Sequence, residues 1–247
     1  MTIDLSGKVA LVTGATGELG RVITRTLAGC GARVAIHYHA NATRAAALHE
    51  ELPGSCVVPA DVTREADVQH MRDAVTAELG APDIIVNNAV IQYEWTNVLE
   101  QSPADYRSQF ESCVLHNVLM AQAFVPAMMA KGWGRVIAIN TECAMQNWPH
   151  QSAYVSGKRG MDGVLRVLAK EVGAHGVTVN QVAPGWMVSE TRPEAGRPDS
   201  YRDKVPLKRF GHDQDIANAV AFLASDLAAF ITGVYLPVCG GNVMPGI

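Results

Sequence analysis

Residues 134–158 read GRVIAINTECAMQNWPHQSAYVSGK, an apolar run followed by hydroxyl, phenol and ammonium side chains. The run over 135–139 predicts a buried strand that ends at Asn140 and Thr141. From residue 152 onward apolar residues recur with a helical period, so Tyr154 and Lys158 should be neighbours on one helix face. Because ligands bind at the carboxyl ends of parallel strands, this stretch predicts a site where its strand ends.

The pair Tyr154 and Lys158 suggests acid–base chemistry. A positive charge beside a phenol favours the phenolate, so we expect Lys158 to lower the pKa of Tyr154. A shift from about 10 to near 7 is worth about 4 kcal/mol, more than an exposed pair supplies. A second positive charge, such as an oxidised nicotinamide, would help. The alternative is an ordinary helix that carries both residues, because i,i+4 pairs are common.

Length and composition favour one large α/β domain over residues 1–247. The chain has 247 residues, of which 48% are apolar, enough for a substantial core, and no stretch has the composition of a linker. The net charge of −4 offers no basic stripe, so we expect no nucleic-acid partner. The N-terminal residues lack a signal peptide, and no apolar run reaches spanning length. We therefore expect a cytoplasmic protein without a membrane partner.

The cysteines and histidines do not indicate a metal site. Five cysteines are scattered along the chain without a Cys-x-x-Cys pair, which suggests neither a disulfide framework nor zinc. His37 and His39 share one face of a predicted strand, but no further ligands lie nearby in the sequence. We expect no bound metal.

A glycine-rich turn near the N-terminus predicts a dinucleotide site. The apolar run 8–12 leads into TGATGELG at 13–20 and then into a helical pattern. Glycines let the backbone approach a pyrophosphate, and the helix N-terminus offers free N–H groups. A bare tight turn is the alternative. The contacts expected from this turn are Gly14, Thr16, Gly17, Leu19 and Gly20.

The residues after the second predicted strand, 33–37, favour NADP over NAD. An acidic side chain there would bind the 2′-hydroxyl of NAD, but the chain continues with Tyr38, His39, Ala40 and Asn41. No carboxylate would repel a 2′-phosphate, and Arg44 follows. His39 and Arg44 are also residues typical of any solvated helix start.

Four further polar residues, three of them after predicted strands, have expected roles in the site or in the fold. Asp61, after the strand 55–59, could bind an adenine amino group or cap the helix that begins near Arg64. Asn87 and Asn88, after the strand 83–86, should mainly tie neighbouring loops together. Asn117 lies inside the predicted helix 103–130, where its amide could hold a water or satisfy a backbone group.

The last third of the chain completes an alternation of strands and helices. A sixth strand over 177–182 ends at Pro184 and Gly185, a helix follows over 214–223, and a last strand occupies 234–238. The alternation implies a doubly wound parallel sheet. Between them, residues 186–211 are polar and contain three prolines, which predicts a mobile lid over the site.

Together these residues resemble the short-chain dehydrogenase/reductase family over essentially the whole chain, most closely its 3-oxoacyl-(acyl-carrier-protein) reductase type. The resemblance implies a seven-stranded Rossmann-type sheet, hydride transfer between a nicotinamide and a carbonyl or alcohol, and a homotetramer or homodimer. The matching pieces are Thr13-Gly14 with Gly20, Asp61, Asn87-Asn88-Ala89, Asn117, Tyr154 with Lys158, Pro184-Gly185, Ile231-Thr232-Gly233 and Gly240-Gly241.

The resemblance also assigns roles to residues. Tyr154 would donate a proton to the substrate oxygen, Thr141 would hydrogen-bond the same oxygen, Lys158 would assist Tyr154 and hold the nicotinamide ribose, and Asn117 would hold a relay water. Further cofactor contacts are expected at His39, Asp61, Val62, Asn88, Ala89, Tyr154, Lys158, Pro184 and Gly185. Substrate contacts are expected from the lid and around Gln92, Tyr93, Trp95, Cys143, Met145, Trp148 and Trp186.

Three residues depart from the family pattern. Glu18 stands where the family's short-form loop has glycine, Val90 where glycine usually follows Asn-Asn-Ala, and Thr141 where serine is usual. We expect Glu18 to point away from a bound pyrophosphate, since a carboxylate against phosphate would be repelled. The expected activity is an NADPH-dependent ketone or 3-oxoacyl reductase. The alternatives are an NAD-dependent alcohol or sugar dehydrogenase and a non-catalytic dinucleotide-binding protein.

Overall fold

The computed structural model of the protein, which describes residues 2–245, is built on a parallel sheet. Seven strands lie in the order β3-β2-β1-β4-β5-β6-β9, and every neighbouring pair is parallel. The predicted Rossmann-type sheet is confirmed. Its strands are β1 (Val9–Val12), β2 (Arg33–Tyr38), β3 (Cys56–Pro59), β4 (Ile84–Asn87), β5 (Gly134–Ile139), β6 (Val177–Pro184) and β9 (Tyr235–Val238).

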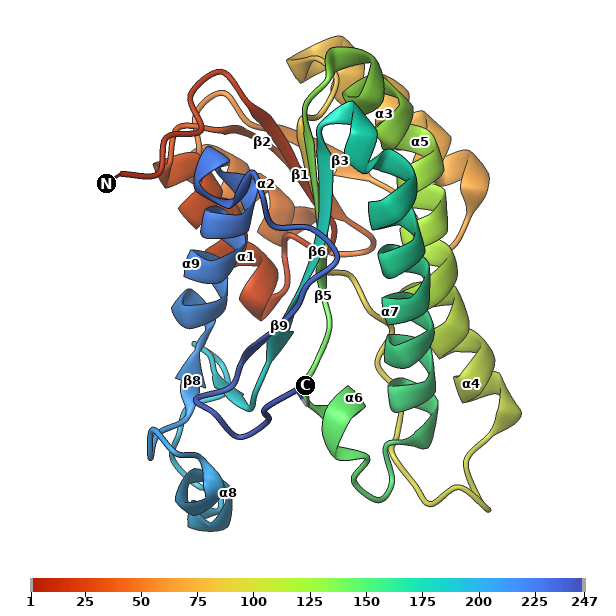
Figure 1. Ribbon diagram of the computed structural model, residues 1–247, viewed down its shortest axis with the longest axis vertical. Helices are drawn as coiled ribbons and strands as arrows, with labels where there is room; N and C mark the ends of the chain where they lie inside the picture. The colour runs from red at the N-terminus through yellow and green to blue at the C-terminus, as the bar shows by residue number, and fades with distance from the viewer. Residues whose placement is uncertain (1, 246–247) are drawn as a thin grey trace.

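Helices cover both faces of the sheet (Figure 1). Successive strand residues point to opposite faces, so Ile85 of β4 joins one core while Ile84 and Val86 join the other. One face carries α1 (Glu18–Gly29), α2 (Ala42–Glu51) and α9 (Asp213–Ala224). The opposite face carries α3 (Glu65–Leu79), α5 (His116–Lys131) and α7 (Ser152–Val172).

The strand register brings the carboxyl ends of the strands to one edge of the sheet. Val12 pairs with Val86, which pairs in turn with Ile137, and Ile139 pairs with Val182. The residues that follow these strands are therefore neighbours although they are far apart in the sequence. The short helices α6 (Cys143–Gln146) and α8 (Asp199–Lys204) lie at this end of the molecule (Figure 1).

The helix predicted over 103–130 contains a π-helical segment. It consists of α4 (Pro103–Gln109), the π-helix η1 (Phe110–Leu115) and α5, which follow one another without a break. The 29 residues Pro103–Lys131 are long and apolar enough to span a membrane, with a mean hydropathy of 1.5 over the most apolar 18 residues. The expectation that no run reaches this length is wrong. Half of that window is buried inside the protein.

The polar segment 186–211, the lid segment from here on, is more ordered than its sequence predicts. Two short strands, β7 (Met187–Val188) and β8 (Gly211–His212), pair in parallel and join its two ends. Between them α8 is attached through Tyr201, which is buried with Val205 and Phe210. Elements of two to six residues show too few turns to produce a period in the sequence, so none was predicted. The 3-10 turns η2 (Gly173–His175) and η3 (Asp226–Ala228) escaped prediction for the same reason.

Candidate active site

The glycine turn between β1 and α1 forms a tight backbone cradle. Gly14 adopts a φ of +64°, which favours glycine. A Cβ on Gly20 would lie 2.1 Å from the carbonyl oxygen of Gly14, so the helix can approach the turn this closely only with glycine there. The N-cap of α1, Gly17, provides no side-chain cap, which leaves the first N–H groups of the helix available to an anion.

Side chains of β1 and β4 fasten this turn to the neighbouring strand end. The hydroxyl of Thr13 accepts hydrogen bonds from the backbone N–H groups of Asn88 (2.9 Å) and Ala89 (3.1 Å). The amide of Asn88 donates to the carbonyls of Thr13 (2.9 Å) and Gly14 (3.2 Å). Asn88 therefore ties the two loops together, as expected for its structural role.

His37, on β2, holds the glycine turn through a hydrogen bond to its backbone, a role that the sequence analysis did not foresee. Its Nδ1 accepts from the N–H of Gly14 at 2.9 Å, and its Nε2 lies 3.0 Å from the carbonyl of Ala60. These partners require the neutral tautomer with the proton on Nε2. Burial lowers the pKa of His37 to about 4, which keeps Nδ1 available as an acceptor at neutral pH.

Two of the residues that depart from the family pattern, Glu18 and Val90, lie near this turn, and local contacts accommodate both. Glu18 forms an ion pair with Arg21 (3.0 Å) and accepts from the N–H of Thr191 in the lid segment (3.3 Å). Its carboxylate is thus already held by groups of α1 and the lid segment. Val90, the second departure, packs partly buried against the core. Thr16 and Leu19 are half-buried and Val62 is buried.

A surface pocket lies where the adenine end of a dinucleotide was expected. It is lined by His39, Pro59, Ala60, Asp61, Arg64, Asp67 and His70. Asp61 does not cap α3, because the N-cap is Arg64 and has no side-chain cap bond; instead Asp61 accepts from the N–H (3.0 Å) and hydroxyl (2.7 Å) of Thr63. The capping interpretation is wrong, because the donors of Thr63, two residues away, bind the Asp61 carboxylate instead.

The basic side chains of this pocket differ from those expected. Arg64 and His70 line it beside His39, whereas Arg44 is exposed at the start of α2 and does not line it. Although burial acts to raise the pKa of Asp61, the hydrogen bonds from Thr63 and the charges of His39 and Arg64 lower it below its usual value. A basic residue at a helix start looks the same whether or not it faces a pocket, so the sequence carried no signal for Arg64.

Thr141, Tyr154 and Lys158 come together beyond the end of β5. Lys158 is buried, and its Nζ donates to the carbonyl of Ile139 at 2.6 Å and lies 5.7 Å from the centre of the Tyr154 ring. The hydroxyl of Thr141 accepts from the N–H of Cys143 at 3.2 Å. The side chains that the sequence assigned to one site are therefore neighbours in space.

The expected lowering of the Tyr154 pKa is wrong for the protein alone. Burial raises the pKa of Tyr154 above its usual value, and a hydrogen bond from Thr141 offsets only part of this effect. Burial also lowers the pKa of Lys158. The sequence could not show that both groups leave water, which penalises the phenolate and the ammonium more than their mutual attraction favours them.

Asn140 joins the loop of Thr141 to α7, while Asn117 bonds within its own helix and to the end of β4. Asn140 accepts from the N–H of Thr141 (2.9 Å), and its amide donates to the carbonyl of Lys158 (3.2 Å). The amide of Asn117 donates to the carbonyl of Cys113 (2.7 Å), while its oxygen accepts from Asn87 (2.8 Å). The bond to Cys113 supports the alternative in which Asn117 satisfies a backbone group. The relay water stays a prediction.

The expected substrate residues divide into two groups. Trp95 stacks on Tyr154 with ring centres 5.8 Å apart. Cys143 lies near the Tyr154 phenol and, after burial, is a further cause of its raised pKa. Trp148 instead contacts Lys204 of the lid segment (4.9 Å), and Trp186, which begins that segment, contacts the Tyr201 ring within it (5.3 Å). Gln92 is exposed on the loop after β4, and Met145 is 39% exposed.

The remaining expected contacts lie at the end of β6 and beside α7. Pro184 ends β6 and accepts from the N–H of Glu142 (2.9 Å), while the N–H of Gly185 donates to Val238 (3.2 Å). Tyr93, expected near the substrate, accepts from the N–H of Tyr154 at 2.8 Å through its hydroxyl, which makes it a positioning contact.

Two further residues escaped the sequence analysis. They are Tyr235, which donates to the carbonyl of Thr141, and the buried Glu142. Across residues 2–245 no cluster of three His, Cys, Asp or Glu side chains is arranged to hold a metal.

Comparison with known proteins gives consistent matches. A family model described as Enoyl-(Acyl carrier protein) reductase matches residues 14–242. The 3-oxoacyl-(acyl-carrier-protein) reductase FabG of Escherichia coli strain K12 is 37% identical, covering 98% of this chain and 100% of that protein. The enzyme of the same name from Staphylococcus epidermidis is 35% identical, covering 96% and 99%.

Solved structures agree in fold. A variant of a Serratia marcescens short-chain dehydrogenase/reductase superposes with a TM-score of 0.89 at 32% identity, covering 96% of this chain and 98% of that one. A blue fluorescent protein from a metagenomic library, solved in complex with NADPH, superposes with a TM-score of 0.90 at 32% identity, covering 98% and 100%.

The two buried histidines should make the fold acid-sensitive. Burial lowers the pKa of His37 to about 4 and that of His116 to about 3, from 6.5. The unfolded chain then binds more protons below pH 6.5, so the stabilisation is complete above 6.5 and is lost as pH falls. We expect each histidine to remove about 2 kcal/mol of unfolding free energy between pH 7 and pH 5.

Urea unfolding at both pH values measures this loss. His37→Gln should lose only about half as much stability between the two pH values as the parent, because one of the two groups is gone. The exposed His39→Gln is the matched control and should behave as the parent does. An identical pH dependence in all three proteins would contradict the prediction.

Proposed function

The chain belongs to the short-chain dehydrogenase/reductase family and is an oxidoreductase, and from this premise we propose that it is an NADPH-dependent 3-oxoacyl reductase. The observation that carries the proposal is the meeting of Thr141, Tyr154 and Lys158 beyond β5, at the sheet edge that also holds the glycine turn. The full-length matches to 3-oxoacyl-(acyl-carrier-protein) reductases support the substrate class.

The residues of the turn fit a nicotinamide dinucleotide. Gly14 and Gly20 let the turn and α1 pack closely together, and α1 presents uncapped N–H groups that a pyrophosphate could accept. The pocket around Asp61 would hold the adenine end. When bound, the nicotinamide supplies or accepts the hydride; the chain orients it and handles the proton.

Tyr154 is the proton donor in this proposal. Its raised pKa keeps the phenol protonated at neutral pH, as a general acid for reduction requires. The phenolic proton passes to the oxygen of the substrate carbonyl, which becomes a hydroxyl group. The stacked Trp95 covers one face of the phenol, so the substrate approaches from the remaining side.

Thr141 and Lys158 serve the same proton transfer. The Thr141 hydroxyl lies near enough to the Tyr154 phenol to act against its raised pKa, and it would donate to the substrate oxygen as negative charge develops there. Lys158 keeps two N–H donors beyond its bond to Ile139, which suits a cofactor ribose. Asn117 would hold the relay water through its backbone or its second oxygen lone pair. The β-branch of Thr141 restricts its rotamers and holds the hydroxyl in place.

Replacing the proton donor and the hydroxyl should separate catalysis from binding. We expect Tyr154→Phe to lower turnover by about 10²–10⁴-fold. Thr141→Val should cost about 10²–10³-fold, while Thr141→Ser should stay within about tenfold of the parent. The assay follows NADPH consumption with a 3-oxoacyl thioester.

Cofactor titration is the control, because all three variants should bind NADPH as the parent does. Parent-like turnover by Tyr154→Phe would remove that residue from the mechanism. Activity in Thr141→Ser alone would identify the parent as a dinucleotide-binding protein that has lost its chemistry.

NADPH should bind more tightly than NADH. No carboxylate directly follows β2, and His39, Arg64 and His70 line the adjoining pocket together with Asp61 and Asp67. Asp61 uses one oxygen on Thr63, and Asp67 uses one on the N–H of Asp61 (3.1 Å), so both are partly engaged. We expect Arg64→Gln to weaken NADPH by about tenfold through the lost charged hydrogen bond.

Side-by-side fluorescence titrations with both nucleotides test this preference. NADH affinity should stay the same in Arg64→Gln, and Arg44→Gln, on the exposed start of α2, is the matched control. Tighter binding of NADH by the parent would favour an NAD-dependent alcohol or sugar dehydrogenase instead.

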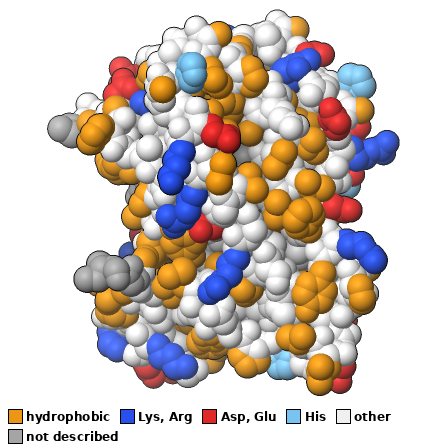
Figure 2. All heavy atoms as spheres, turned by 45° about the vertical axis from the view of Figure 1, so that its right-hand side comes forward, with side chains coloured by type: hydrophobic (Ala, Val, Ile, Leu, Met, Phe, Trp, Pro, Cys, Tyr) orange, Lys and Arg blue, Asp and Glu red, His pale blue; other side chains and the backbone are white. Residues whose placement is uncertain are grey.

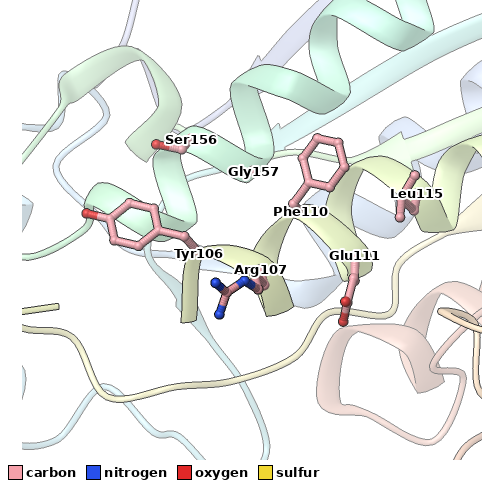
Figure 3. A pocket seen from close by; sticks show the side chains of 7 residues that line it. All are labelled: Tyr106, Arg107, Phe110, Glu111, Leu115, Ser156 and Gly157. Carbon is pink, nitrogen blue, oxygen red and sulfur yellow. The ribbon is translucent and has the colours of Figure 1, made fainter. Parts of the chain in front are cut away.

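We also propose that the chain forms a homotetramer or homodimer through α4, η1 and α7. Apolar side chains gather on this side of the molecule (Figure 2), among them Phe110 (52% exposed) and Leu115 (38% exposed). Figure 3 shows Phe110 beside the turn of α7 that carries Gly157, with Arg107 and Glu111 pointing away from α7. Opposite charges one turn apart suit a twofold contact, in which each meets its opposite.

Phe110→Glu should reduce the assembly to a smaller species in sedimentation, because a charge would be buried at the twofold contact. Leu99→Glu is the matched control, since Leu99 is 95% exposed on the loop before α4. An unchanged mass for Phe110→Glu would show that the contact lies elsewhere.

We propose a cytoplasmic location, which the five free cysteines support.

A further inference from the structure

Glu142 is a buried carboxylate between two residues of the site, and its position needs an explanation. It follows Thr141 and precedes Cys143, and its exposure is only 4%. Burial raises the pKa of Glu142, which reflects the cost of removing a carboxylate from water. A charge in this position is retained only where hydrogen bonds compensate it.

The compensation comes from two segments that are distant in sequence. The Tyr201 hydroxyl donates to one carboxylate oxygen at 2.8 Å, and the Asn242 amide donates to the other at 3.0 Å. Tyr201 also accepts from the backbone N–H of Trp186 at 2.7 Å. A continuous chain of hydrogen bonds therefore runs from the beginning of the lid segment, through α8, to the loop that carries Thr141.

Tyr201 is the single buried residue of α8, so this chain of bonds is the main attachment of that helix. Its ring stacks on Phe210 and meets the edge of Trp186, each with ring centres 5.3 Å apart. The second contact of α8 with the loop after β5 is the exposed pair Lys204 and Trp148. Of the two, the buried contact to Glu142 is the one that water does not weaken.

The two hydrogen-bond donors of Glu142 indicate that its carboxylate binds them in the ionised form. Both Tyr201 and Asn242 act as donors, and an ionised carboxylate can accept from both at once, whereas a protonated acid presents one donor of its own. Hydrogen bonds to a charged acceptor are also the stronger class. Glu142 is thus suited to hold two segments that are distant in the sequence with one side chain.

We propose that Glu142 is a positioning residue that latches α8 over the substrate site and couples the lid segment to Thr141. The inference rests on the proposed reductase function for its effect on substrate, but the latch itself is a property of the fold. Loss of the latch lets the lid segment open, which weakens substrate binding and leaves intact the glycine turn, which follows β1, two strands away from β5.

Two variants remove the latch from opposite ends. Glu142→Gln keeps the shape and removes the charge, and Tyr201→Phe keeps the ring in its aromatic cluster and removes the hydroxyl. Arg202→Gln is the matched control, because Arg202 lies on α8 but pairs only with the surface residues Asp199 (2.7 Å) and Glu194 (3.5 Å). All three variants leave in place the apolar contacts that the ring at position 201 makes.

Limited trypsin digestion measures the latch without any substrate. Lys204 offers a cleavage site in α8, and the bond after it should be cut about tenfold faster in Glu142→Gln and Tyr201→Phe, the effect of losing one charged hydrogen bond. Arg202→Gln should be cut at the parent rate. The double variant should be no faster than either single one, because both remove the same contact.

Kinetics then connect the latch to substrate. With a 3-oxoacyl thioester we expect KM to rise about tenfold in both latch variants with kcat changed less, and NADPH affinity to stay at the parent value. Parent-like cleavage in both latch variants, or fully additive effects in the double variant, would overturn the latch. Faster cleavage in proteins that all fail to reduce any 3-oxoacyl thioester would keep the latch and overturn the proposed function.

Discussion

Buried polar groups at the carboxyl edge of the parallel sheet must satisfy one another, and the architecture of the site depends on this constraint. A parallel register delivers the ends of β1, β4, β5 and β6 to the same place, where backbone and side chains leave the regular ladder. Thr13 with Asn88, and Asn140 with Lys158, meet the hydrogen-bonding needs of neighbouring loops. Each such pair positions a segment that cofactor or substrate would touch.

The same burial decides the electrostatics of the proton donor. Lys158 lies near the phenol of Tyr154, yet its Nζ is committed to the carbonyl of Ile139; Lys158 is buried and Tyr154 is half-buried. Desolvation penalises the charged form of each group. It therefore raises the pKa of the phenol and lowers the pKa of the ammonium. A protonated Tyr154 suits reduction, and an added positive charge at the site would be needed to favour the reverse proton transfer.

The lid segment is held at two points that belong to different parts of the site. At its beginning, Glu18 and Arg21 of α1 contact Thr191 and Glu190 beside the glycine turn. At α8, the Tyr201 hydroxyl reaches the loop of Thr141. The residue that departs from the family's glycine loop thus belongs to one of these attachments, which gives Glu18 a structural reason to be present.

Local patterns in the sequence were sufficient for the strands and the long helices, and they supplied the candidate site residues. The apolar runs at 8–12 and 135–139, the glycine turn, and the i,i+4 spacing of Tyr154 and Lys158 each follow from short-range geometry, which a sequence displays directly. The tertiary structure alone decided what depends on partners distant in the chain. His37 supports Gly14 across 23 positions, and Glu142 meets Tyr201 across 59. Burial, which raises the pKa of Tyr154 against the pull of Lys158, is likewise a property of the assembled core, because no residue carries its own desolvation in the sequence.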